Sequence, residues 1–203
     1  AGFVFVSADD PYAHSSQNEQ DNRNFARMYN LIMLEPGNPS EAKEMVIKGY
    51  EISEEIGHPV MIRSTTRVSH VRSIVELGHI REILKEGEFK KDPSRYVVVP
   101  TNARRNHLEL MKRLKKAREL SEKSELNYVT ELSGANTKVG RFGIIASGVA
   151  YYYAYEGVLR NDIEAKLLKL GFSYPLPERK IIDFLSDLET LLIVEEIDPI
   201  MER

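Results

Sequence analysis

The sequence predicts an α/β fold in which helices cover a parallel sheet. Short apolar runs alternate with amphipathic stretches, which is the order expected of strands joined by right-handed crossover helices. Polar loops also follow two of the apolar runs directly. Because parallel sheets bind ligands beyond the carboxyl ends of their strands, these loops are the first place to expect a functional site.

The first apolar run, residues 3–6, predicts a buried strand, and the polar stretch 7–23 follows it. This stretch contains one histidine together with hydroxyls, amides and carboxylates. Hydrophobic burial cannot explain such a composition. We therefore expect the stretch to be a loop at the ligand-binding edge of the sheet, running into a helix over residues 18–30.

A strand at residues 31–34 and a helix from Pro39 are predicted next. Asn38 is a capping residue, Pro39 suits the first helical position, and Glu41 stands three residues after the cap. Apolar residues recur on one face of this helix, and Gly57 is placed to end it.

A further strand over residues 59–64 leads into a second polar loop, 65–72. Because both loops follow parallel strands, we expect them to face one crevice. Arg67 and Arg72, with neighbouring hydroxyls, suit a carboxylate or phosphate. A solvated turn is the alternative interpretation. His14 is a candidate proton carrier or hydrogen-bonding group, and a purely structural role for it remains open.

The rest of the chain divides into a connection and a second α/β region. Residues 73–94 predict a linker, with a helix at 80–85. The helix expected over 102–122 is basic, but it lacks interleaved aromatic residues and therefore favours a solvated face over nucleic acid. In the last third, strands are expected at 142–147, 165–170 and 191–194, with helices at 149–159 and 177–185. The tyrosines of the helix at 149–159 predict contact with the sheet and with another domain or subunit.

Composition excludes several kinds of function. The chain has 203 residues, a net charge of −3 and no cysteine, so thiolate catalysis and cluster ligation by this chain are excluded. No apolar run approaches the roughly 20 residues of a membrane span, and no metal-ligand motif occurs. We expect a cytoplasmic protein that binds neither membranes nor nucleic acid. The immediate entry into a core strand also predicts a fragment cut inside a domain.

Five segments then carry a family resemblance: 8–23, 33–36, 65–70, 169–178 and 194–199. In this order they resemble the alpha subunit of indolepyruvate ferredoxin oxidoreductases, within the 2-oxoacid:ferredoxin oxidoreductase family. The pyruvate and 2-oxoglutarate members have a different loop where this chain has residues 14–21.

The resemblance implies a thiamine diphosphate enzyme that oxidatively decarboxylates arylpyruvates to aryl-acetyl-CoA and reduces ferredoxin. It implies the C-terminal half of a pyrimidine-binding domain at 1–72, a linker at 73–94 and a transketolase C-terminal-like α/β domain at 95–203. The activating glutamate, the Gly-Asp-Gly motif for magnesium and diphosphate, and the cysteine-rich cluster domain have no counterpart in this sequence. The fragment alone is therefore expected to be inactive.

For the whole enzyme the resemblance implies thiamine diphosphate with magnesium, iron-sulfur clusters, CoA, a beta subunit, ferredoxin and an oligomer. It assigns no catalytic or metal-binding residue to this chain. The residues expected to border the cofactor and substrate cleft come from both polar loops: His14, Ser15, Ser16, Gln17, Asn18, Thr66, Arg67 and His70. Alternatives are a pyruvate or other 2-oxoacid enzyme, a self-contained binding or regulatory module, and a docking piece that only makes subunit contacts.

Overall fold

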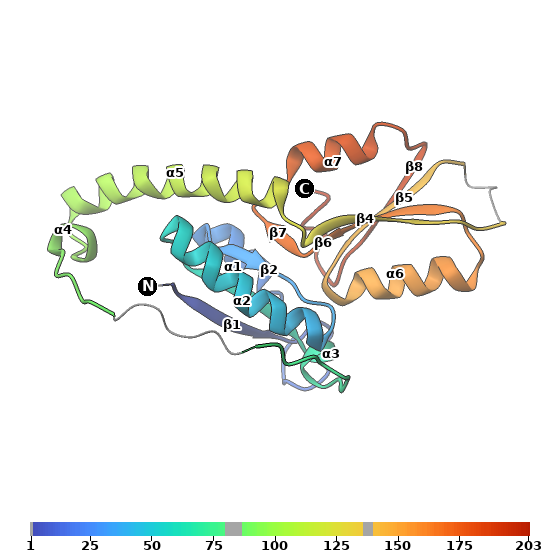
Figure 1. The fold of residues 1–203 in the computed structure, drawn as a ribbon, viewed down its shortest axis with the longest axis horizontal. Coiled ribbons are helices and arrows are strands. Elements are labelled where there is room, and N and C mark those ends of the chain that lie inside the picture. The colour runs from blue at the N-terminus through green and yellow to red at the C-terminus, as the bar shows by residue number, and fades with distance from the viewer. Residues whose placement is uncertain (1, 80–86, 136–139) are drawn as a thin grey trace.

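The computed structural model describes residues 2–79, 87–135 and 140–203. It is a mixed α/β structure with two four-stranded sheets, as Figure 1 shows. The predicted α/β class is therefore correct. The helix predicted at 80–85 lies outside the described residues.

The first sheet contains the ligand-binding edge that the sequence predicts. Its strands are β1 (Val4–Asp9), β2 (Ile32–Leu34), β3 (Val60–Thr65) and β7 (Phe172–Tyr174), in the order β1-β3-β2-β7. The first three run parallel, and β7 pairs antiparallel with β2. The apolar side chains of β2 and β3 are buried on both faces of the sheet. The sequence of these strands therefore consists of short, continuous apolar runs.

The second sheet has the order β4-β6-β5-β8. Its strands are β4 (Asn127–Leu132), β5 (Phe142–Ser147), β6 (Ala165–Leu170) and β8 (Thr190–Val194). The strands β5, β6 and β8 are parallel and agree with the sequence prediction, whereas β4 is an antiparallel edge strand that the prediction lacks. Strand β7 was not predicted either, because a strand of three residues is too short to show an alternation of apolar and polar residues.

The longer helices follow the predicted positions except at the start of the first one, whereas the four-residue helices Thr66–Ser69 and Pro93–Tyr96 were not predicted. The described helices are α1 (Arg23–Tyr29), α2 (Pro39–Ile56), α3 (Thr66–Ser69), α4 (Pro93–Tyr96), α5 (Pro100–Lys123), α6 (Gly148–Arg160) and α7 (Glu178–Leu185). The prediction of a helix from residue 18 is wrong for residues 18–22, because side-chain carboxylates bind the backbone amides of this region and stabilise turns instead. None of the described helices is long and apolar enough to cross a membrane.

Strand β7 connects the two sheets along the chain. Strand β7 lies between β6 and α7 in the sequence but completes the first sheet beside β2. Helix α5 contacts β7 at one end and extends away from both sheets at the other (Figure 1). The division into 1–72, 73–94 and 95–203 stays a prediction.

Candidate functional site: two loops at one sheet edge

The two polar loops begin side by side. Strands β1 and β3 pair in parallel register from Val4 with Val60 to Asp9 with Thr65, so their carboxyl ends lie next to each other. The chain then continues into the first loop at Asp10 and into the short helix α3 at Thr66. The sequence-based expectation that both loops leave a common edge therefore agrees with the geometry.

Asp10 organises both loops. Its carboxylate accepts backbone N–H groups of His14 at 3.0 Å, Ser15 at 2.8 Å and Ser16 at 2.6 Å. It also accepts the Oγ1 hydroxyl of Thr66, from the other loop, at 2.6 Å. These bonds, that from Thr66 above all, hold the pKa of Asp10 well below its ordinary value. The carboxylate thus stays ionised and fixes the two loops against each other.

The exposed rim of the site combines a cation with aromatic rings. The Nη2 atom of Arg67 lies 3.4 Å from Nε2 of His14, and Nη1 donates a hydrogen bond of 2.9 Å to the hydroxyl of Tyr153. The Arg67 guanidinium also lies 5.5 Å from the centre of the Tyr153 ring, and the centre of the Tyr12 ring lies 5.7 Å from that of the His14 ring. Arg67 forms no ion pair among the described residues, so its charge is available to an anionic ligand.

The other predicted site residues take different positions. The Ser16 hydroxyl donates to the carbonyl oxygen of Asn18 at 2.5 Å, which stabilises the loop itself. Gln17 is exposed beside it. His70 ends α3 with an exposed side chain, and Arg72 is exposed after it. The structure thus brings His14, Thr66 and Arg67 together with Asp10, while Gln17 and His70 contact none of these side chains.

A buried ionic cluster lies beneath the loops. Arg63, only 2% exposed, contacts Asp9 at 2.5 Å, Glu35 at 2.7 Å and Glu196 at 3.2 Å. Burial alone would lower the pKa of Arg63, but these three carboxylates raise it above its ordinary value. Burial in turn raises the pKa of Glu196. The cluster joins the ends of β1, β2 and β3 to the segment after β8.

Arg23 extends this cluster toward the C-terminal segment. It contacts Asp21 at 2.6 Å and Glu195 at 2.8 Å, and donates to the carbonyl oxygens of Glu196 and Asp198. Asp21 in turn lies 3.9 Å from Arg63. Both buried arginines therefore connect the first loop to residues 195–198 across more than 170 positions of sequence.

Sequence reasoning missed these buried groups. Asp9, Asp10, Arg23 and Arg63 were not among the predicted site residues, because charged residues are expected at the surface. Two signals were nevertheless present. An arginine inside the apolar run of β3 needs a buried partner, and the acidic pair after β8 stands at the carboxyl end of a parallel strand.

The tyrosine-rich helix α6 contacts the loops of the first sheet. The Tyr152 hydroxyl accepts a hydrogen bond of 2.6 Å from Asn38 and donates to Glu41, at the start of α2. Tyr153 reaches Arg67 on the other loop. Helix α6, which packs against the second sheet, therefore contributes one side of the candidate site.

The acidic side chains at this sheet edge are already bound by other groups of the protein. The described residues contain no group of three or more histidine, aspartate and glutamate side chains placed to hold a metal ion. Asp10 is fully engaged by loop hydrogen bonds, and Asp9 and Glu35 pair with Arg63. These described carboxylates serve the fold of the loops and the strand ends.

Comparison with known proteins decides the family resemblance. The chain is 46% identical over 203 residues to indolepyruvate oxidoreductase subunit IorA of Methanothermobacter thermautotrophicus, covering 100% of this chain and 32% of the relative. It is 42% identical over 208 residues to the IorA subunit of Thermococcus kodakarensis, of which it covers 31%. The chain is related over its whole length to the IorA subunits. No protein-family model matches it.

A solved structure shares the fold of this chain. The structure matches 2-oxoglutarate:ferredoxin oxidoreductase from Magnetococcus marinus with a TM-score of 0.60 and 11% identity, covering 95% of this chain and 41% of that one. This similarity concerns the fold alone. The predicted resemblance to the indolepyruvate oxidoreductase alpha subunit is confirmed, and the chain spans about a third of the length of the IorA relatives it matches.

Proposed function

We propose that this chain serves as part of a thiamine diphosphate-dependent oxidoreductase that decarboxylates arylpyruvates to aryl-acetyl-CoA and reduces ferredoxin. The single observation that carries the proposal is the joint placement of His14 and Arg67 on two loops at one sheet edge, in a chain related to IorA subunits. The two loops form one wall of the cleft, and its other walls come from outside this chain.

Arg67 is the residue we expect to bind the substrate carboxylate. Its guanidinium has no carboxylate partner among the described residues, and it lies at the exposed rim. A guanidinium pairs with a carboxylate through two parallel hydrogen bonds, which fixes orientation as well as charge. Tyr153 and Tyr12 offer ring surfaces on either side of the Arg67 and His14 pair, which suits a substrate that carries an aromatic ring.

The whole enzyme would combine this chain with components that it does not supply. We propose thiamine diphosphate with magnesium, iron-sulfur clusters and CoA as its cofactors and co-substrate, and a beta subunit and ferredoxin as its partners. An oligomer and a cytoplasmic location belong to the same proposal. The absence of cysteine from this chain requires that any cluster ligands lie elsewhere.

Kinetics of the intact enzyme test the proposal. Arg67→Ala should raise KM for an arylpyruvate about tenfold or more, because a charge-assisted bidentate contact is lost. His14→Ala should lower kcat or raise KM. Arg160→Ala is the matched control, since Arg160 only pairs with Glu156 on the exposed side of α6 and should leave both constants unchanged.

Comparison of substrates separates the alternatives. Turnover of indolepyruvate and phenylpyruvate above pyruvate and 2-oxoglutarate supports the arylpyruvate assignment, whereas a preference for pyruvate would replace it with a different 2-oxo acid. Unchanged turnover and KM in both the Arg67 and His14 variants would remove the proposed role of the loops.

A further inference from the structure

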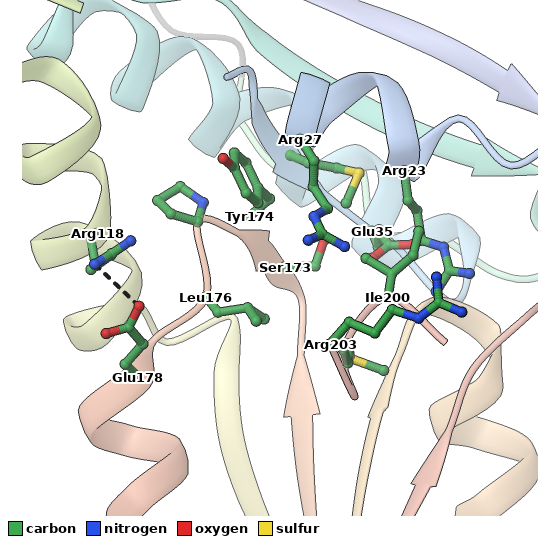
Figure 2. A pocket seen from close by; sticks show the side chains of 13 residues that line it. Arg23, Arg27, Glu35, Arg118, Ser173, Tyr174, Leu176, Glu178, Ile200 and Arg203 are labelled. Atoms are coloured by element: carbon green, nitrogen blue, oxygen red, sulfur yellow. Dashed lines mark ion pairs between the residues drawn. The ribbon is translucent and has the colours of Figure 1, made fainter. Parts of the chain in front are cut away.

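A cavity lies where the segment after β8 returns to the first sheet. It measures about 170 Å³ and opens between α1, strand β7 and the start of α7. Figure 2 shows its lining, which includes Arg27 from α1, Ser173 from β7 and Arg118 from α5. The proposed function does not use this cavity.

The arginines that line the cavity differ in whether a carboxylate pairs with them. Arg23 is paired with Asp21 and Glu195, and Arg118 lies 3.1 Å from Glu178. Glu35, on the opposite side, is paired with Arg63. Arg27 and Arg203 also line the cavity, and neither has a carboxylate partner among the described residues. Arg27 is therefore available to pair with an anion that enters the cavity.

Ser173 supplies an independent indication of a ligand. The residue is only 6% exposed, and its Oγ atom is buried without a hydrogen-bond partner. A buried hydroxyl with no partner costs free energy, and such groups in native proteins call for an explanation. In Figure 2 the Arg27 guanidinium extends from α1 in the direction of Ser173. A donor hydroxyl and a free guanidinium directed into one cavity are the groups that bind a carboxylate or phosphate.

The wall that closes the cavity is held in place by buried contacts. The Glu195 carboxylate accepts the backbone N–H groups of Ile200 at 3.1 Å and Met201 at 2.9 Å. Arg23 binds the same carboxylate and the carbonyl oxygen of Asp198. Because these contacts order the segment, the cavity is a formed site. Its apolar lining includes Met33, Leu176 and Ile200, which favours a ligand with an apolar body.

We propose that this cavity binds a small organic anion, with its carboxylate or phosphate group between Arg27 and Ser173 and its apolar part against Met33, Leu176 and Ile200. None of His14, Thr66 and Arg67 lines this cavity, so the ligand would not have to compete with the substrate for these side chains. Arg118 and Arg203 add positive charge around it without having to contact the ligand.

Two probes test the site by isothermal titration of the purified full-length protein. Phenylacetate represents an aryl carboxylate, and inorganic phosphate represents a phosphate group alone. Saturable binding of phenylacetate above phosphate identifies a carboxylate site with an apolar subsite, whereas the reverse order identifies a phosphate site. The absence of saturable binding of either probe at millimolar concentration would overturn the proposal.

Variants show whether the binding occurs in this cavity. Arg27→Ala should weaken binding about tenfold or more, and Ser173→Ala should weaken it severalfold. Arg104→Ala is the matched control, because Arg104 is an exposed arginine on the distant part of α5. Equal losses in Arg27→Ala and Arg104→Ala would show unspecific attraction and would overturn the assignment.

Ser173→Ala also separates ligand binding from a structural role. Because the hydroxyl has no partner, its removal should leave the free energy of unfolding of the ligand-free protein unchanged or raise it. Reduced affinity with undiminished stability supports the proposal. Lower stability with unchanged affinity would show that the hydroxyl serves the fold instead and would remove Ser173 from the site.

Discussion

At the scale of single residues, Asp9 and Asp10 show how neighbouring carboxylates can take different tasks. Asp9 faces into the molecule and pairs with Arg63, whereas Asp10 accepts three backbone amides of its own loop and the Thr66 hydroxyl. The first fixes the strand ends, and the second fixes the shape of the loop above them. The position of His14 at the rim depends on both.

Asp10→Asn should weaken the loop and alter the dependence of stability on pH. A carboxylate whose pKa is lower in the folded state stabilises the protein above its unfolded value of 3.8, and this contribution is lost as the pH falls toward the lower folded value. The variant should therefore unfold at lower temperature at pH 7 and lose less stability than the parent as the pH falls below about 4. Thermal unfolding followed by circular dichroism between pH 7 and pH 2 measures both effects. Parallel curves for the two proteins would contradict this role of Asp10.

Arg63→Met should be among the most destabilising single changes. It leaves Asp9 and Glu35 buried without their counter-charge, and breaking a buried ion pair in this way costs about 3–5 kcal/mol. Urea unfolding gives the difference in free energy. Arg104→Met, at an exposed position on α5, should change it by less than about 0.5 kcal/mol. A similar small change for Arg63→Met would mean that the carboxylates take up protons or water at little cost.

Residues of the site were predictable to the extent that they are exposed and polar. His14, Thr66 and Arg67 follow apolar runs directly, so topology alone places them at one edge. Asp9 and Arg63 were not predictable in the same way, because their roles depend on partners such as Glu196 that lie far away in the sequence. Local pattern carries no information about such pairs.

At the scale of secondary-structure elements, α2 has the most explicit sequence signals. The Asn38 side chain accepts the backbone N–H of Glu41 at 2.9 Å, and Gly57 ends the helix with a φ of 69°. Both features were predicted from residue types alone, because capping chemistry is local. The Glu41 carboxylate differs from a standard capping box, since it accepts the N–H of Gly37 at 2.7 Å.

Asn38→Ala should destabilise the protein by about 1–2 kcal/mol, because the capping bond is lost. The change also removes the donor that contacts the Tyr152 hydroxyl on α6. Asn38→Asp is the informative companion, since it keeps an acceptor for the Glu41 amide but has no amide donor. Urea unfolding should give a smaller loss for the aspartate variant. Equal losses would show that the contact with Tyr152 matters more than the cap.

The elements that sequence reasoning missed share a physical cause. Strand β4 is an antiparallel edge strand with alternating exposure, and β7 has only three residues. The start of α1 at Arg23 is set by Asp9 and Asp10, whose carboxylates bind the amides of residues 14–16 and 22. In each case tertiary contacts outweigh local propensity.

At the scale of the whole molecule, the junction between the two sheets is tightly packed. A Cβ atom at Gly37 would lie 2.4 Å from the carbonyl oxygen of Gly148 and 2.7 Å from the Tyr152 ring. The loop before α2 therefore touches the start of α6 by backbone. Only glycine permits this approach, so the relative placement of the sheets depends on it.

Gly37→Ala should consequently cost several times more than an ordinary glycine replacement, on the order of 3 kcal/mol, because backbone must move. Gly157→Ala is the matched control: Gly157 lies within α6, and its added Cβ would meet nothing within 4 Å. The control should raise stability by up to about 1 kcal/mol, since alanine favours a helix. Opposite signs in thermal unfolding support the close packing of the junction, whereas matching signs would contradict it.

Lys169 offers the most direct test of how the sheets are joined. This lysine of β6 is 1% exposed, forms an ion pair with Glu41 of α2 and lies 4.4 Å from the centre of the Tyr152 ring. Burial lowers the pKa of Lys169, although Glu41 acts in the opposite direction. Lys169→Met keeps an unbranched side chain one atom shorter but leaves Glu41 without its cation, so we expect a loss of about 3 kcal/mol in urea unfolding. Faster hydrogen exchange should appear at the start of α2 and in α6.

The double variant Lys169→Met with Glu41→Gln should recover part of this loss, because no uncompensated charge then remains at the junction. Lys166→Met is the control on the same strand: its partners Asp187 and Glu131 are both exposed, so the change should cost less than about 1 kcal/mol. Additive effects of the two junction changes would show that Lys169 and Glu41 act independently. In that case the packing around Gly37, and not this ion pair, would hold the junction between the sheets together.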